Sequence, residues 1–175
     1  GSTQPTVSWI TYPFAWSVDA AETRARRVLD RWGLLDREVD IIGFSMGGIV
    51  ARMLAHGIAG RDGELRRPPL RVRRMFTLAS PHRGAHLAAM VRPDIAARQL
   101  AAGSTLLRAL DVALPSRAYD LTCYRITKDW MVGPGNTAPE GVPMVSVDPW
   151  NWFSQRFGHF SVAYSPQLVL DLARR

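Results

Sequence analysis

Residues 41–50 read IIGFSMGGIV, and this stretch decides how the rest of the chain is interpreted. The segment 38–44 is apolar at its centre, which is typical of a buried strand. The pattern then changes to IVARMLAHG, which predicts a helix that ends at Gly57. Ser45 therefore falls at the junction between a buried strand and a helix.

The glycines around Ser45 favour a catalytic role for it over that of a small residue in a tight turn. A nucleophile elbow is a sharp, strained turn, and small residues at Gly43 and Gly47 prevent side-chain collisions there. The Ser45 hydroxyl then projects above the sheet, and the backbone N–H of Met46, at the helix start, can donate to a developing oxyanion. The G-x-S-x-G pattern is specific only in this context, which includes the additional Gly48.

A nucleophilic serine needs a histidine and an acid, in the chain order Ser, Asp or Glu, His. His159 lies in RFGHFSV, after the last expected strand and before the last expected helix; packing among aromatic residues is its alternative interpretation. Asp129 directly follows an expected strand, and Asp148 also ends one. We favour Asp129, because one strand should separate the acid from the histidine loop. His82 and His86 are candidates to line the pocket but precede any suitable acid.

The elements expected along the chain alternate between strands and helices. Strands are expected at 7–12, 38–44, 70–78, 119–127 and 144–147, and helices at 19–32, 47–56 and 166–173, with helical patches between 85 and 114. The first helix is expected to begin with a capping box of Asp19 and Glu22, and 60–69 reads as a loop. This order predicts an α/β fold, namely a mainly parallel sheet with helices on both faces.

Composition limits the kind of protein. A chain of 175 residues, 47% of them hydrophobic, fits one domain covering 1–175. No apolar run approaches the roughly 18 residues of a membrane span, so the visible chain is expected to be soluble. The opening Gly1-Ser2 resembles a cloning remnant, and the compartment stays open. Cys123 is the one cysteine, so an internal disulfide and a cysteine-based metal site are excluded.

The net charge of +7 comes almost entirely from arginine, since Lys128 is the one lysine. The arginines are spread along the chain and are not interleaved with aromatic residues as in an RNA-binding motif. We therefore predict a basic solvated surface and no nucleic-acid partner.

Together these motifs resemble the α/β-hydrolase superfamily, in particular its lipase and esterase branch, which includes the PGAP1-like proteins. The likeness is carried by GFSMGGIVARML around Ser45, TLASPHRGAHLA at 77–88, GSTLLRAL at 103–110, KDWMVGPGNTA with Asp129, and GHFSV with His159. The resemblance implies a serine hydrolase of carboxylic esters that forms an acyl-enzyme on Ser45 and needs no metal or organic cofactor. It also implies that 85–118 forms a helical cap over the acyl chain of a small-molecule or lipid ester. We expect Phe44, His82 and Trp130 to line the substrate site.

One departure from the family pattern concerns the oxyanion hole. Family members usually carry a histidine-glycine loop upstream of the elbow, whose backbone supplies the second oxyanion donor. Here only GSTQPT precedes the strand expected at 7–12, so the first strands and that loop are expected to be missing. The sheet edge exposed in this way would favour a homo-oligomer. Two alternative functions stay open: an inactive or weak pseudo-hydrolase that acts as a binding protein, and an acyltransferase.

Overall fold

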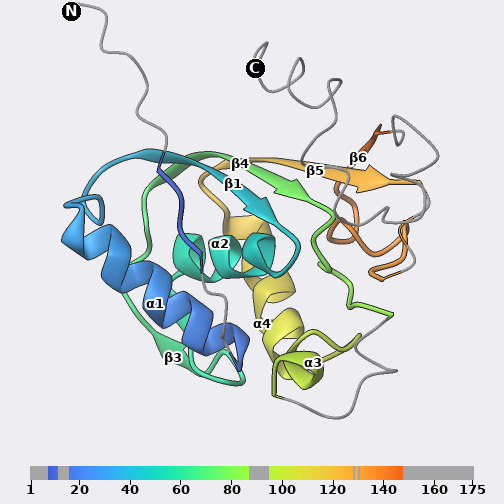
Figure 1. Cartoon of the computed structure of the whole chain (residues 1–175), viewed down its shortest axis with the longest axis horizontal. Helices are drawn as coiled ribbons and strands as arrows, with labels where there is room; N and C mark the ends of the chain where they lie inside the picture. The colour runs from blue at the N-terminus through green and yellow to red at the C-terminus, as the bar shows by residue number, and fades with distance from the viewer. Residues whose placement is uncertain (1–7, 12–15, 87–94, 128, 130, 148–175) are drawn as a thin grey trace, which may run out of the picture.

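The structure is a computed structural model that describes residues 8–11, 16–86, 95–127, 129 and 131–147. At its centre is a four-stranded sheet in the order β1-β4-β5-β6, and all three strand pairings are parallel (Figure 1). The strands are β1 (Val39–Phe44), β4 (Val72–Leu78), β5 (Asp120–Ile126) and β6 (Met144–Val147). This confirms the expected mainly parallel sheet.

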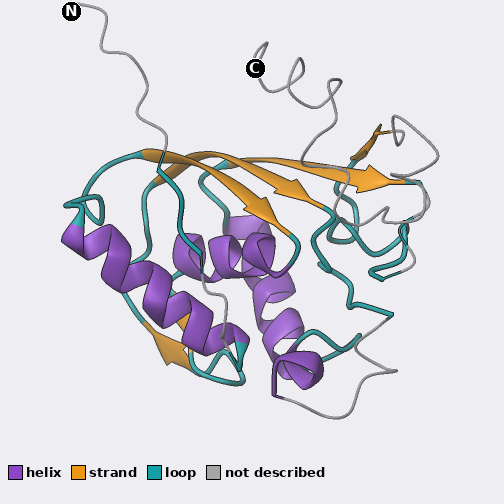
Figure 2. Ribbon diagram, viewed as in Figure 1, coloured by secondary structure: helices purple, strands orange, loops and turns teal. Residues whose placement is uncertain are grey.

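The described helices lie on one side of this sheet (Figure 2). They are α1 (Val18–Arg31), α2 (Met46–His56), α3 (Ile95–Gln99) and α4 (Thr105–Ala113), which continues into the 3₁₀ turn η2 (Leu114–Ser116). The last helix expected from sequence, at 166–173, falls outside the described residues. In this layer α1 precedes β1, α2 lies between β1 and β4 in the chain, and α3 and α4 lie between β4 and β5.

Local signals explain where the two longest helices begin and end. α1 begins after Ser17, whose side-chain oxygen accepts a hydrogen bond from the N–H of Ala20 at 3.2 Å. The expected capping box of Asp19 and Glu22 was therefore wrong, because Ser17 lies at the position from which a side chain reaches the first N–H groups. α2 ends at Gly57, which has the left-handed φ of 63°, as the sequence predicted.

Buried apolar side chains from α1, α2 and α4 form the main hydrophobic core beneath the sheet. α4 contributes Leu106, Leu107 and Leu110, none of which is more than 2% exposed. α4 is thus part of the core, and the expectation that 85–118 acts as a helical cap over the acyl chain stays a prediction. Residues 87–94 of that interval lie outside the described residues.

Two further segments differ from the sequence-based expectations. Residues 8–11 form no strand; Ile10 packs against the core and the carbonyl of Thr11 accepts a hydrogen bond from Arg24 Nε at 3.0 Å. A strand needs a neighbour for its backbone groups, and in the described part of the chain β1 pairs with β4 alone. In the expected loop 60–69, Leu65–Arg66 (β3) pairs antiparallel with Ile58–Ala59 (β2).

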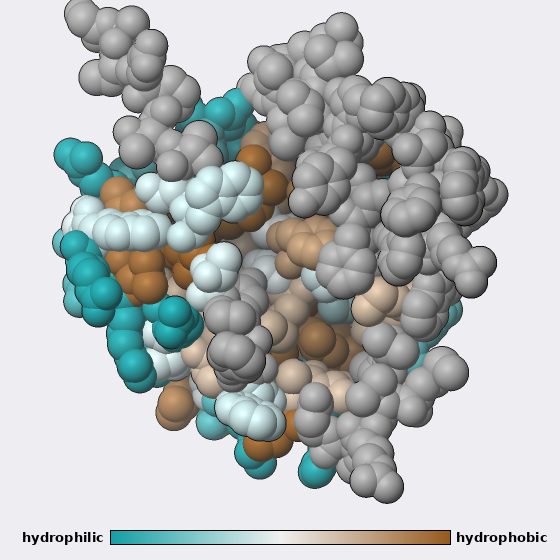
Figure 3. Space-filling model, viewed as in Figure 1, coloured by the Kyte–Doolittle hydropathy of each residue, from teal (hydrophilic) through white to brown (hydrophobic). Residues whose placement is uncertain are grey.

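The surface is rich in arginine, as expected, and some of its charge is paired. Figure 3 shows hydrophilic side chains along the rim beside α1 and more hydrophobic ones toward the middle of this face. Arg73 and Arg74 both hydrogen-bond Asp40, Arg73 at 2.7 Å, and these bonds hold the pKa of the Asp40 carboxyl well below its usual range. Within the described residues, no helix has the length and apolar character that crossing a membrane requires.

Candidate active site

Ser45 occupies a strained turn between β1 and α2. Its φ of 52° and ψ of −125° lie in a region that residues with a side chain rarely adopt. Its N–H donates to the carbonyl of Leu78 at 2.8 Å, which anchors the turn to the end of β4. The turn is so tight that a β-carbon on Gly43 would lie 2.7 Å from the backbone N and Cα of Gly48. The elbow predicted from the sequence is therefore present in its backbone geometry.

We expect Gly43→Ala to destabilise the protein, because the added methyl group would collide with backbone atoms that cannot rotate away. Such overpacking costs about 1–3 kcal/mol. Gly135→Ala is the matched control, since a β-carbon there meets nothing within 4 Å and should change the free energy of unfolding by less than about 0.5 kcal/mol. Urea unfolding of both variants measures the difference; equal midpoints would contradict the tight turn.

α2 begins directly after Ser45, and this places the helix start at the candidate nucleophile. Met46 is the first residue of α2, so its N–H has no acceptor within the helix and belongs to the positive end of the helix dipole. The Ser45 side chain does not cap α2. The Met46 N–H therefore lies at the start of α2, next to the candidate nucleophile in the chain.

Asp129 lies at the same edge of the sheet as Ser45. It follows β5, and parallel strands end on the same side, so the two residues are separated by two strand spacings, about 10 Å. The residue is fully buried, and its Oδ1 accepts hydrogen bonds from the N–H groups of Met131 at 3.0 Å and Val132 at 3.2 Å. The carboxylate is therefore held in a fixed orientation by the loop that it begins.

The loop 79–86, which follows β4, contacts both the elbow and the loop that Asp129 begins. Ser80 Oγ donates to the carbonyl of Gly43 at 3.3 Å, and a β-carbon on Gly48 would lie 2.2 Å from it. On the other side, a β-carbon on Gly133 would lie 2.5 Å from the His86 ring. Sequence reasoning missed Ser80, although its place directly after a strand, in ASPHRG, was the available signal.

His82, which was expected to line the substrate site, is completely buried. Its Nε2 lies 2.9 Å from Thr77 Oγ1 and its Nδ1 lies 3.3 Å from Arg52 Nη1. Burial, and secondly the charge of Arg52, lower the pKa of His82 well below its usual value. Both ring nitrogens thus face protein groups, and His82 is not part of the substrate contacts proposed below.

Of the expected site residues not yet considered, Phe44 alone falls within the described part of the chain. Phe44 is partly buried beside a second apolar cluster, which includes Phe76 and Tyr124. Trp130, Asp148 and His159 lie outside the described residues. No group of three or more histidine, cysteine, aspartate or glutamate residues in the described ranges could hold a metal ion.

A cavity of about 560 Å³ lies away from this edge of the sheet. It is lined by Glu38, Arg73 and Asp120, which lie at or just before the amino-terminal ends of β1, β4 and β5. Because Ser45 and Asp129 follow the carboxyl-terminal ends of their strands, this cavity is not the site described here.

Comparisons with known proteins relate the chain to hydrolases through structure. No protein-family model matches it, and no curated protein matches its sequence. Among solved structures it is similar to the lipase BlEst2 of Bacillus licheniformis in its mature form, with a TM-score of 0.52, 16% identity, and coverage of 89% of this chain and 70% of that one. For the propeptide form of the same lipase the TM-score is 0.50 at 16% identity, with coverage of 83% of this chain and 36% of that one. The parallel sheet, the strained serine after β1 and the likeness to this lipase establish that the chain has an α/β-hydrolase-like fold.

Proposed function

We propose that this protein hydrolyses carboxylic esters through an acyl-enzyme formed on Ser45. The observation that carries the proposal is the strained position of Ser45 between β1 and α2, with the buried carboxylate of Asp129 at the same edge of the sheet. Backbone strain of this kind persists only where the surrounding structure enforces it, and it is concentrated at functional sites. The serine hydrolase class also agrees with BlEst2, which is a lipase.

In the proposed reaction, His159 removes the proton from Ser45 Oγ as the oxygen attacks the ester carbonyl. The oxyanion that forms accepts a hydrogen bond from the N–H of Met46. When the tetrahedral intermediate collapses, the ester C–O bond breaks and His159 protonates the departing alcohol. Water, deprotonated by the same histidine, then releases the carboxylic acid from Ser45. Asp129 holds the imidazole and stabilises its charged form.

The proposed substrates are small-molecule or lipid esters with an apolar acyl group. Phe44 directly precedes the proposed nucleophile in the chain and is partly buried, and we propose its ring as the first apolar contact. We propose Trp130, which directly follows Asp129 in the chain, as the second apolar contact. A ring at each of these positions would favour alkyl over charged acyl groups.

A fluorophosphonate probe tests this proposal. We expect the folded protein to be labelled and peptide mass spectrometry to find the adduct on Ser45, because an activated serine attacks the electrophilic phosphorus whereas an ordinary hydroxyl does not. Heat-unfolded protein is the control and should not be labelled. Hydrolysis of p-nitrophenyl esters of increasing chain length, run in parallel, measures the acyl pocket. A folded protein that is neither labelled nor active would contradict the proposed ester hydrolysis and favour a role as a binding protein.

A further inference from the structure

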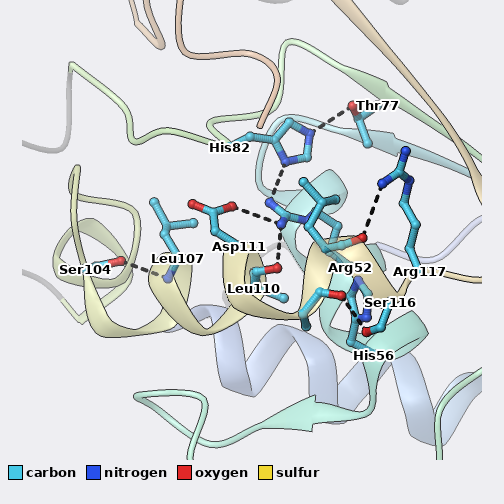
Figure 4. A network of polar contacts seen from close by, with 12 residues as sticks. Arg52, His56, Thr77, His82, Ser104, Leu107, Leu110, Asp111, Ser116 and Arg117 are labelled. Carbon is cyan, nitrogen blue, oxygen red and sulfur yellow. Dashed lines mark hydrogen bonds and ion pairs between the residues drawn. The ribbon is translucent and has the colours of Figure 1, made fainter. Parts of the chain in front are cut away.

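A buried arginine lies on α2, two helical turns beyond the candidate nucleophile Ser45. Arg52 has no exposed surface, and its Nη1 lies 3.3 Å from Nδ1 of His82 (Figure 4). Its Nη2 donates to the carbonyl of Leu110 at 2.8 Å and to the carboxylate of Asp111 at 3.1 Å. One guanidinium thus connects α2 with the loop after β4 and with α4.

The chemistry of these contacts fixes the state of His82. A guanidinium can only donate, so Nδ1 of His82 must accept from Arg52 and carry no proton. The ring proton is then on Nε2, which donates to Thr77 Oγ1 at 2.9 Å. His82 is therefore neutral, in the Nε2–H form, and it joins Arg52 to β4.

This network holds the loop that lies against the elbow. His82 belongs to the loop 79–86, whose Ser80 side chain lies against Gly48 and donates to the carbonyl of Gly43. Two turns further along α2, Arg52 fixes the helix to the same loop through His82. The helix that carries Met46 is therefore tied to this loop at two points, near its first turn and two turns further on.

Because Arg52 lies two turns along α2 from Ser45, a small rotation of the helix about Arg52 would displace Ser45. Ser45 and Arg52 are seven residues apart, which is about 10 Å along a helix that rises about 1.5 Å per residue. A rotation of about 6° about Arg52 would move Ser45 by about 1 Å, and a misplacement of that size can cost about 10²-fold in rate. Control of the helix orientation at Arg52 therefore matters for Ser45.

A purely structural role would be served better by an apolar residue. The carboxylate that pairs with Arg52, Asp111, is 46% exposed, and within the described part of the chain the buried Nε of Arg52 has no hydrogen-bond partner. Replacing buried charged groups by packed apolar side chains is often neutral or stabilising. A buried guanidinium that lowers stability at this position is consistent with a role in orienting α2.

We propose that Arg52 and neutral His82 form a clamp that positions Ser45 and the Met46 N–H against the loop after β4, and that it acts on turnover more than on substrate affinity. Both are positioning residues, since neither contacts the reacting atoms. The kinetic part of the proposal rests on the ester hydrolysis proposed above, whereas the clamp itself is a property of the fold.

Nitrogen-15 NMR of the histidine rings in the full chain tests the state of His82. We expect its spectrum at neutral pH to show the neutral Nε2–H form, with the signals assigned by their loss in His82→Asn. A proton on Nδ1, or a charged ring, would overturn the clamp. This measurement does not depend on any enzymatic activity.

Two amide variants of His82 then separate its hydrogen bond with Arg52 from its hydrogen bond with Thr77. His82→Asn keeps an acceptor near the position of Nδ1 and loses the contact with Thr77, whereas His82→Gln keeps a donor near the position of Nε2 and loses the acceptor for Arg52. We expect kcat of His82→Gln to fall by about 10- to 100-fold with KM changed less than about twofold, and His82→Asn to keep most of the wild-type kcat. Asp120→Asn, at an exposed residue at the start of β5, is the control and should be as active as the wild type.

Hydrogen exchange of the backbone amides at 43–48 tests the clamp independently of enzymatic activity. We expect faster exchange in His82→Gln than in His82→Asn or in the wild type. Equal exchange in all three proteins would overturn the clamp, as would a kinetic loss confined to KM. If the wild type hydrolyses no ester but exchange and the ring spectrum behave as expected, the proposed function fails and the clamp stands.

Discussion

Replacing Ser45 with alanine is expected to lower kcat for ester hydrolysis by about 10⁶-fold, because members of a catalytic triad act as a unit. The free energy of unfolding should change by less than about 0.5 kcal/mol. Alanine has a β-carbon like serine, so the backbone strain at φ 52° is the same in both proteins, and the Ser45 side chain does not cap α2. Initial rates with a p-nitrophenyl ester and a thermal unfolding curve measure the two quantities.

Ser116→Ala is the matched control for this variant. Ser116 is an exposed serine in η2, where its hydroxyl donates to the carbonyl of Ala113 at 2.8 Å. Its replacement should leave both the rate and the unfolding temperature unchanged. A Ser45→Ala protein with more than about 1% of the wild-type kcat would show that another group is the nucleophile.

The sequence predicted the elements whose signals are local. β1 and α2 follow from the change of apolar period around Ser45, and the end of α2 follows from a glycine that can adopt a left-handed conformation. The strand at 144–147 has the same bounds in the structure. In each case, residues within a few positions determine the backbone, so the pattern is sufficient.

Elements that depend on distant partners were predicted less well. Glu22 was expected to cap α1, but it is buried and pairs with Arg26 at 2.9 Å and with Arg67 at 2.7 Å. Arg67 is 45 residues away, and no local pattern indicates that contact. Residues 8–11 have the composition of a strand, yet strand formation also needs a neighbouring backbone, which composition does not supply.

The same distinction applies to the candidate site. Ser45 and Asp129 could be proposed because each lies just after a predicted strand, and strand ends can be predicted from the sequence. The buried pair of Arg52 and His82 was missed as a unit, because its members are 30 residues apart and each looks like an ordinary polar residue in its own segment. The sequence thus indicates groups placed by strand ends better than it indicates the contacts that orient them.

Asp129→Asn is expected to lower kcat by about 10⁴-fold, since an amide cannot stabilise the charged imidazole and favours the wrong ring tautomer. The loop should keep its structure, because the amide oxygen can still accept from the N–H groups of Met131 and Val132. KM should change little, since in the proposed mechanism the carboxylate acts on His159 and not on the substrate. Steady-state kinetics on a p-nitrophenyl ester measures both parameters.

Asp120→Asn controls for the loss of a negative charge on β5, because Asp120 is an exposed residue at the opposite end of the same strand. It should retain the wild-type kcat. Asp148→Asn tests the rival acid of the sequence-based prediction. If this variant loses about 10⁴-fold while Asp129→Asn stays active, the acid follows β6 and not β5. In that case the fixed carboxylate of Asp129 would serve only to hold its loop, because the hydrogen bonds from Met131 and Val132 suit either role.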